Sequence, residues 1–161
     1  MKKIITVDGP AGSGKEKICK YIARKYNLFH LDSGILYRRL AYELQKKNIK
    51  AFEVDKIKRI IKNIKKLSLR KTQSLRKEQI GNLASEIAKL DFIRYFINTQ
   101  QRLATKSPNK KKGFVIDGRD IGSVVFKGAF LKLYIDVDVN IRAKRRYKQL
   151  IDNGEKSIYL K

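Results

Sequence analysis

Hydrophobic positions along the chain follow two different spacings, which predict strands and helices in turn. Short runs of consecutive apolar residues, typical of strands buried on both faces, occur at 4–7, 29–31, 114–116 and 131–135. Apolar residues three and four apart, typical of helices with one buried face, occur at 18–26, 36–44, 54–64 and 80–103, the last with a break near Asp91. Asp138 can cap a final helix. This alternation favours an α/β fold with a parallel sheet.

The composition is that of a folded domain. The chain has 161 residues, of which 42% are hydrophobic and 34% are charged, so it is too apolar for a disordered protein and long enough for one compact domain. Its only cysteine, Cys19, has no partner for an internal disulfide. The first apolar run ends at Asp8, too early for a signal peptide or a membrane span, so we expect a cytoplasmic protein with no membrane contact.

The net charge is strongly positive. The chain carries 39 Lys and Arg against 15 Asp and Glu, a net charge of +24, and residues 51–112 hold 17 of the basic and 5 of the acidic residues. Such a field attracts polyanions, among them nucleotides and nucleic acid. The excess consists mostly of lysine, with 27 Lys to 12 Arg, so an AT-rich coding bias is an alternative explanation. We expect nucleic acid to bind only through nonspecific charge.

A glycine-rich loop lies between the first predicted strand and the first predicted helix. It reads Gly9, Pro10, Ala11, Gly12, Ser13, Gly14 and Lys15, which fits the pattern G-x-x-x-x-G-K. In this pattern the backbone N–H groups face one anion, the helix adds its positive end, and the lysine reaches the β- and γ-phosphates. The loop therefore predicts a site for nucleotide phosphates.

The position after the lysine departs from the pattern. A Ser or Thr there normally offers its hydroxyl to Mg²⁺, whereas this chain has Glu16 followed by Lys17. A carboxylate is a good Mg²⁺ ligand, but its charge also repels the phosphates, and Lys17 offsets part of that repulsion. We count both residues with the ATP-binding loop and keep Glu16 as one candidate metal ligand.

Four blocks of sequence, in this order, resemble bacterial cytidylate kinases. They are 8–15, then 31–34 with Tyr37 and Arg38, then 117–126, and finally a basic helix with Arg142, Ala143, Arg145, Arg146, Gln149 and Leu150. The resemblance runs from residue 4 to about residue 154 and is weakest at 48–75. It implies transfer of the γ-phosphate of ATP to CMP or dCMP, with ATP and Mg²⁺ as the cofactors.

The resemblance also implies an acceptor site. The matching positions are Ser33, Arg38, Arg76, Ser85, Arg94, Arg119 and Asp120. Of these, Ser85, Arg94 and Asp120 match the family's cytosine-reading positions. A carboxylate accepts a hydrogen bond from the exocyclic amine of cytosine, whereas the carbonyl of uracil would leave two acceptors facing each other. Taken singly, the arginines would be ordinary exposed side chains.

Phosphoryl transfer between nucleotides needs alignment and charge neutralisation but no general base, because the attacking phosphate oxygen is already ionised. We assign Lys15 to the ATP phosphates and the backbone amides of 9–14 to the β-phosphate. Arg119, with Arg145 or Arg146, is expected to stabilise the transferred group. Asp117, which ends a predicted strand, is expected to hold Mg²⁺ directly or through water.

Compared with the family, the chain stops within the expected lid, without the later Arg-Asp-x-x-Asp segment or the last strand and helix. We therefore expect four parallel strands in spatial order 2-3-1-4, with strand four at an open edge and covered on the face of Leu131, Leu133 and Ile135. We expect one P-loop kinase domain. Its parts are a core at 1–34 and 106–140, nucleoside-monophosphate-binding helices at 35–105, and a truncated lid helix at 141–161.

Two other reactive side chains have plainer interpretations. We expect His30, beside the second strand, to be structural and Cys19 to belong to the core, since no spacing in the sequence indicates a zinc site. Two alternatives to an active kinase stay open. One is a nucleotide- or nucleic-acid-binding module without turnover, and the other is a truncated gene product that associates nonspecifically. Apart from nucleotides we expect no partner, and we expect a monomer.

Overall fold

The structure, a computed structural model, describes residues 3–106 and 110–152. The chain divides into two compact units: unit 1 comprises Met1–His30 and Lys111–Lys161, and unit 2 comprises Leu31–Lys110. Unit 1 is thus built from both ends of the sequence, and unit 2 is a continuous insertion. The centre of the expected loop, 107–109, and the end of the expected lid, 153–161, lie outside the described residues.

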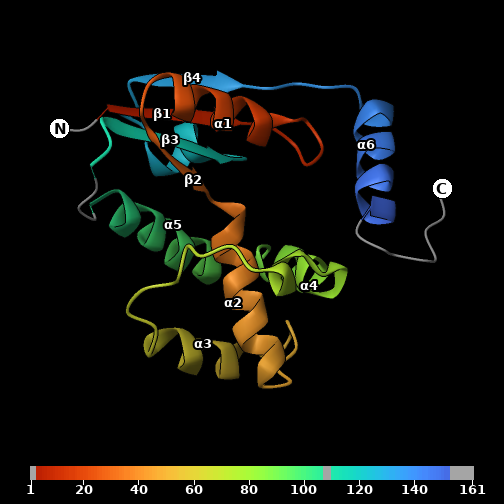
Figure 1. Ribbon diagram of the computed structural model, residues 1–161. Helices are drawn as coiled ribbons and strands as arrows, with labels where there is room; N and C mark the ends of the chain where they lie inside the picture. Colours follow the sequence, from red (N-terminus) through yellow and green to blue (C-terminus); the bar gives the residue numbers. More distant parts are fainter. Residues whose placement is uncertain (1–2, 107–109, 153–161) are drawn as a thin grey trace. The chain divides into compact units, whose positions relative to one another are not determined.

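A four-stranded sheet forms the centre of unit 1 (Figure 1). The strands are β1 (Lys3–Asp8), β2 (Phe29–Asp32), β3 (Gly113–Gly118) and β4 (Leu131–Tyr134), in the order β2-β3-β1-β4. Strand β1 pairs in parallel with both β3 and β4, which places Val7 opposite Asp117 and Leu133. Every residue of β3 is buried, as its continuous apolar run predicts. The predicted order 2-3-1-4 is confirmed.

The two faces of β1 carry different contacts, because side chains alternate along a strand. On one face Val7 packs with Cys19, Leu28 and Val115, and Cys19 belongs to α1 (Lys15–Lys25), so the prediction that Cys19 is a core residue is confirmed. On the other face Thr6 lies against η2 (Ile121–Val125), where a β-carbon on Gly122 would come within 2.6 Å of the Thr6 hydroxyl oxygen.

Strand β4 is less covered than predicted. Leu131 is 43% exposed and Tyr134 is 66% exposed, whereas Leu133 and Ile135 are half-buried. The prediction that Leu131 is covered is wrong, because it stands at the start of an edge strand that pairs with β1 alone. After β4, helix α6 (Val139–Asp152) begins as predicted: a carboxylate oxygen of Asp138 accepts hydrogen bonds from the backbone N–H groups of the second and third following residues.

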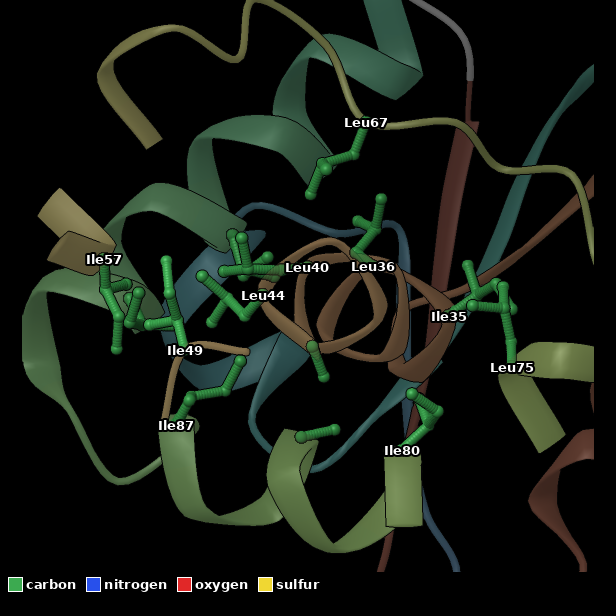
Figure 2. Close-up of a cluster of buried hydrophobic side chains, with 14 residues drawn as sticks. Ile35, Leu36, Leu40, Leu44, Ile49, Ile57, Leu67, Leu75, Ile80 and Ile87 are labelled. Atoms are coloured by element: carbon green, nitrogen blue, oxygen red, sulfur yellow. The ribbon is translucent and has the colours of Figure 1, made fainter. Parts of the chain in front are cut away.

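Unit 2 is helical, and its core surrounds one helix. Its elements are α2 (Gly34–Lys46), α3 (Val54–Lys62), η1 (Gln73–Arg76), α4 (Glu78–Ile87) and α5 (Asp91–Lys106). Figure 2 shows Leu36, Leu40 and Leu44 along α2, with Ile49, Ile57, Leu67, Leu75, Ile80 and Ile87 around them. Leu40 and Leu44 are completely buried. The break predicted near Asp91 is confirmed, since α4 and α5 are separate helices.

Helix α3 ends at Lys62, earlier than the apolar spacing up to Ile64 predicts. The chain leaves the helix and turns its backbone toward α5. There the side-chain oxygen of Gln100 accepts a hydrogen bond from Leu67 N at 2.9 Å, and its amide nitrogen donates to the Lys65 carbonyl at 3.4 Å. These bonds satisfy backbone groups in place of a further helical turn. No helix within the described residues is long and apolar enough to cross a membrane.

Candidate functional site

The glycine-rich loop adopts a path that glycine makes possible. Gly9, Gly12 and Gly14 have φ angles of +152°, +77° and +87°, a region that other residues rarely adopt. A β-carbon on Gly9 would lie 2.5 Å from the carbonyl oxygen of Ile135, so the loop also passes too close to its neighbours for a larger residue. The loop ends at the first turn of α1, where the Gly14 carbonyl accepts from Lys17 N at 3.0 Å and the positive end of the helix faces the loop. This is the arrangement expected of a phosphate-binding loop.

Two side chains of the loop are placed to meet an anion. The ammonium group of Lys15 donates to the carbonyl of Pro10 at 3.0 Å, so it lies across the loop. Ser13 is only 4% exposed, and within the described part of the chain its hydroxyl oxygen has no hydrogen-bond partner. Leaving a buried hydroxyl unsatisfied costs about 1–3 kcal/mol, which a phosphate oxygen accepting its proton would recover.

A cavity of about 320 Å³ lies beside the loop. It is lined by Gly9, Pro10, Ala11, Arg119, Tyr134 and Arg142. Arg119, which was predicted, and Arg142 therefore line the same hollow as the start of the loop, and Nε of Arg142 donates to the Val137 carbonyl at 3.0 Å. The sequence named Arg142 only as part of the family's basic helix. Its position one turn before Arg145 and Arg146 was the signal that could have placed it in the site.

Helix α6 reaches the loop through Arg145. One guanidinium nitrogen of Arg145 donates to the carbonyls of Gly12 at 3.3 Å and Ser13 at 3.2 Å. Arg145 thus holds the loop backbone from outside, and its predicted contact with a transferred phosphate stays a prediction. Arg146 is half-buried on the same helix.

Asp8 has a role that sequence reasoning missed. Its two carboxylate oxygens each accept a backbone hydrogen bond at 2.8 Å, one from Ile121 N and one from Gly122 N. The carboxylate is 7% exposed and fixes the first turn of η2. Arg119 and Asp120 immediately precede that turn, so Asp8 positions both. A buried acid at the end of a strand needs donors, but the sequence alone does not say which segment supplies them.

In unit 2 the predicted acceptor residues gather around α4. Arg38 on α2 donates to the carbonyl of Leu75 at 2.7 Å, next to Arg76. A β-carbon on Gly81 would lie 2.9 Å from the Arg38 guanidinium, so this group rests directly on α4. The Ser85 hydroxyl donates to the Gly81 carbonyl at 3.0 Å, one turn further along. Arg38 is therefore fixed next to two other predicted acceptor positions.

The remaining acceptor residues are more dispersed. Ser33 is buried at the start of α2, and Arg94 is exposed on α5. Both belong to unit 2, whereas Arg119 and Asp120 belong to unit 1. The predicted CMP-binding set is thus divided between the two units.

Unit 2 also contains a larger cavity, of about 790 Å³. Its lining comes from α2, α3 and the segment after α3: Arg39, Glu43, Lys47, Ile60, Asn63, Ile64, Lys65, Lys66, Leu67 and Ser68. None of these is a predicted nucleotide-binding residue. This cavity is therefore separate from the residues that the sequence assigns to CMP.

The two predicted Mg²⁺ ligands are both engaged by other side chains. A carboxylate oxygen of Glu16 lies 2.8 Å from the ammonium group of Lys20, on the surface of α1. A carboxylate oxygen of Asp117 lies 3.1 Å from Nε2 of His30, and Asp117 is 5% exposed. Mg²⁺ prefers an octahedron of oxygen ligands and retains water. Because Asp117 is set beside a nitrogen donor, this arrangement does not supply that set, and we derive no step through a protein-held Mg²⁺.

Comparison with known proteins decides between the interpretations that the geometry leaves open. The model of the cytidylate kinase family matches residues 5–161. The chain belongs to the cytidylate kinase family. Among its relatives, the cytidylate kinase of Caldicellulosiruptor saccharolyticus is 36% identical, over 96% of this chain and 73% of its own length. The cytidylate kinase of Bartonella bacilliformis is 38% identical, over 98% of this chain and 72% of its own length.

A further relative is the bifunctional pantoate ligase/cytidylate kinase of Prochlorococcus marinus subsp. pastoris, which is 35% identical over 98% of this chain. The chain spans 33% of that longer protein. A solved structure, that of TT1252 from Thermus thermophilus, matches 97% of this chain and 74% of that one, with a TM-score of 0.44 and 13% identity. Membership of the cytidylate kinase family favours a kinase over a binding module without turnover.

Proposed function

We propose that this chain is a nucleoside monophosphate kinase that transfers the γ-phosphate of ATP to CMP or dCMP, giving ADP and CDP or dCDP. Its membership of the cytidylate kinase family supports this activity. The structural observation that carries the proposal is the loop of three positive-φ glycines at the start of α1, beside a cavity lined by Arg119 and Arg142.

Unit 1 would bind ATP, which arrives as its Mg²⁺ complex. The backbone amides of 9–14 and the start of α1 suit the β-phosphate, and Lys15 suits the β- and γ-phosphates. Lys15 now donates to a neutral carbonyl, that of Pro10. Exchanging this acceptor for a phosphate oxygen would pair the ammonium charge with an anion in place of a neutral carbonyl.

Unit 2 would bind the phosphate of CMP. Arg38 is bonded to the carbonyl of Leu75, the residue before Arg76, and planar guanidinium groups match phosphate oxygens in pairs. We assign Ser85, Arg94 and Asp120 to the cytosine ring, with the Asp120 carboxylate accepting from the exocyclic amine. Ser33 would contact the acceptor nucleotide at the start of α2.

In the reaction, an ionised oxygen of the CMP phosphate attacks the γ-phosphorus of ATP. A new phosphorus–oxygen bond forms, and the bond to the β-phosphate oxygen breaks with its electron pair leaving on ADP. The residues need only align the two nucleotides and neutralise the charge on the transferred group. Arg119 is the first candidate for that neutralisation because it faces the loop cavity, and Arg145 and Arg146 are the others. The monomeric state and the cytoplasmic location remain predictions.

The test is a coupled assay of ADP formation with CMP, dCMP, UMP and AMP as acceptors. We expect CMP or dCMP to be converted and UMP and AMP to be much poorer. Lys15→Ala is expected to lower kcat/KM by about 10²–10³, as removal of one preorganised charge-stabilising donor does. Lys25→Ala, at the other end of α1, removes the same charge and is the matched control. Folded protein that binds ATP but converts neither CMP nor dCMP at any Mg²⁺ concentration would refute the proposal.

A further inference from the structure

Three side chains with metal-binding chemistry meet between α1 and the sheet of unit 1. Cys19 comes from α1, His30 from β2 and Asp117 from β3. One donor atom of each, a sulfur, a ring nitrogen and a carboxylate oxygen, lies within 4.8 Å of the other two. The closest pair is His30 Nε2 and Asp117 Oδ1, at 3.1 Å. These residues are far apart in sequence, so no local motif reveals the cluster.

All three donors are shielded from water. Cys19 is completely buried, Asp117 is 5% exposed, and the His30 side chain is 13% exposed. The cluster adjoins the apolar packing of Val7, Leu28 and Val115 around Cys19. An apolar shell of this kind limits the access of bulk solvent to a bound ion. A solvated carboxylate on the surface would not indicate a metal site, because exposed acidic groups are common without a bound ion.

The distances suit a tetrahedral ion. Bonds of about 2.0–2.3 Å from zinc to nitrogen, oxygen and sulfur place neighbouring ligand atoms roughly 3.3–3.7 Å apart. The 3.1 Å pair is already close to this value, and the separation of the sulfur from the other two donors needs to shrink by about 1.5 Å at most.

The donor set also selects the kind of ion. Thiolate and imidazole ligands favour Zn²⁺ and related transition metals, whereas Mg²⁺ and Ca²⁺ take oxygen ligands. We propose that Cys19, His30 and Asp117 form a site for one divalent transition-metal ion, best suited to Zn²⁺, with a fourth position left to water. The ion would join α1, β2 and β3. The site is independent of the proposed kinase activity.

Cobalt provides the test, because Co²⁺ replaces Zn²⁺ and reports its ligands by colour. Full-length protein, without nucleotide, is titrated with Co²⁺ under reducing conditions. We expect one equivalent to bind, with visible bands typical of tetrahedral cobalt and a near-ultraviolet band from sulfur-to-cobalt charge transfer. Since Cys19 is the only cysteine, that last band can come from no other residue of the chain. Added Zn²⁺ should bleach the spectrum and raise the Tm of the protein.

Three variants locate the site. Cys19→Ser should abolish the charge-transfer band, and His30→Gln should alter the visible bands. Each should weaken Zn²⁺ binding at least about 100-fold, since loss of an outer-shell partner alone costs 10–100-fold. Leu28→Val trims the same core without removing a donor, so it should keep the full spectrum and the Zn²⁺-induced rise in Tm.

Either of two results would overturn the proposal. One is the absence of a sulfur-to-cobalt band in folded wild-type protein at saturating Co²⁺. The other is a Zn²⁺ affinity, measured against a chromophoric chelator, that is the same in folded Cys19→Ser or His30→Gln as in the wild type. Both readouts are independent of phosphoryl transfer, so a failed kinase assay leaves this test intact.

Discussion

Gly9 and Gly128 differ in their surroundings, and the difference predicts that the same substitution destabilises the protein at Gly9 and leaves its stability almost unchanged at Gly128. Gly9 has φ +152°, and a β-carbon there would lie 2.5 Å from a backbone oxygen, whereas one on Gly128 would meet nothing within 4 Å. Gly9→Ala should cost about 1–3 kcal/mol of unfolding free energy and weaken ATP binding, because the loop must move. Gly128→Ala should change stability by less than about 0.5 kcal/mol. Urea denaturation and ATP calorimetry measure both, and equal stability of the two variants would contradict the loop geometry.

Glu16 places a negative charge at the start of α1, where phosphates are expected. Its ion pair with Lys20 is exposed at the surface, so removing it should cost less than about 1 kcal/mol of stability. Glu16→Ser should tighten ATP binding about fivefold, because it removes a repulsion of roughly 1 kcal/mol. The measurement is the Kd for ATP with and without Mg²⁺. Glu86→Ser, the same change on an exposed position of unit 2, should leave the Kd unchanged, and weaker binding by Glu16→Ser would show that Glu16 assists the nucleotide.

Residues of the site were predictable from sequence where the chemistry is local. The phosphate loop is one continuous segment with glycines at fixed spacing, and the positive φ angles follow from that spacing. The bonds from Asp8 to the start of η2, and the meeting of Cys19 with His30, join segments that are far apart along the chain. Sequence periodicity says which face a residue occupies but not which distant side chain faces it, so these contacts required the structure.

At the scale of the element, α6 depends on one capping side chain. Asp138 accepts two backbone hydrogen bonds at the start of this helix, and the same helix carries Arg145, which bonds to the loop carbonyls. Asp138→Ala should destabilise the helix by about 1 kcal/mol. We expect faster amide hydrogen exchange in the first turns of α6 and a higher KM for ATP.

Asp136→Ala is the control for the capping prediction. Asp136 is an exposed aspartate two residues earlier, so the substitution removes the same charge but leaves the cap in place. If the amide protons of α6 exchange at the same rate in both variants, the loss of negative charge explains the effect and the capping role of Asp138 is refuted.

Element types were predictable, and the ends of elements less so. Apolar spacing identified the strands and helices because each buries one continuous face or run. The early end of α3 was not predictable, because Ile64 continues the helical spacing of apolar residues. The chain nevertheless leaves the helix before Ile64, and Gln100, far along the sequence, forms hydrogen bonds with the backbone of the segment that follows. Similarly, the alternation of apolar and polar residues along β4 predicts that one face of the strand is buried. Burial of Leu131 would need neighbouring elements on that face, and the edge strand β4 lacks them there.

For the whole molecule, the division into two units predicts where a core mutation acts. Leu40 is completely buried in the cluster around α2, and all members of that cluster belong to unit 2. Leu40→Ala should reduce stability by about 2–5 kcal/mol through lost burial and a cavity. Amide exchange should accelerate first in residues 31–110, because the cavity lies in that cooperative unit.

Tyr95→Ala provides the control for the core mutation. Tyr95 lies on α5 of the same unit, but its side chain is 75% exposed, so its loss should change the unfolding free energy by less than about 0.5 kcal/mol. Uniform acceleration across both units in Leu40→Ala would show that they unfold as one cooperative body.

The order of the strands in the sequence has a consequence for biosynthesis. Strand β1 is translated before unit 2, yet both of its hydrogen-bonded neighbours, β3 and β4, are translated after the whole of that unit. The helices of unit 2 build their core from one another, so they can fold while the phosphate loop is still attached to an unpaired strand. Nascent chains that stall before residue 131 should therefore contain a folded helical segment and no competent nucleotide cradle.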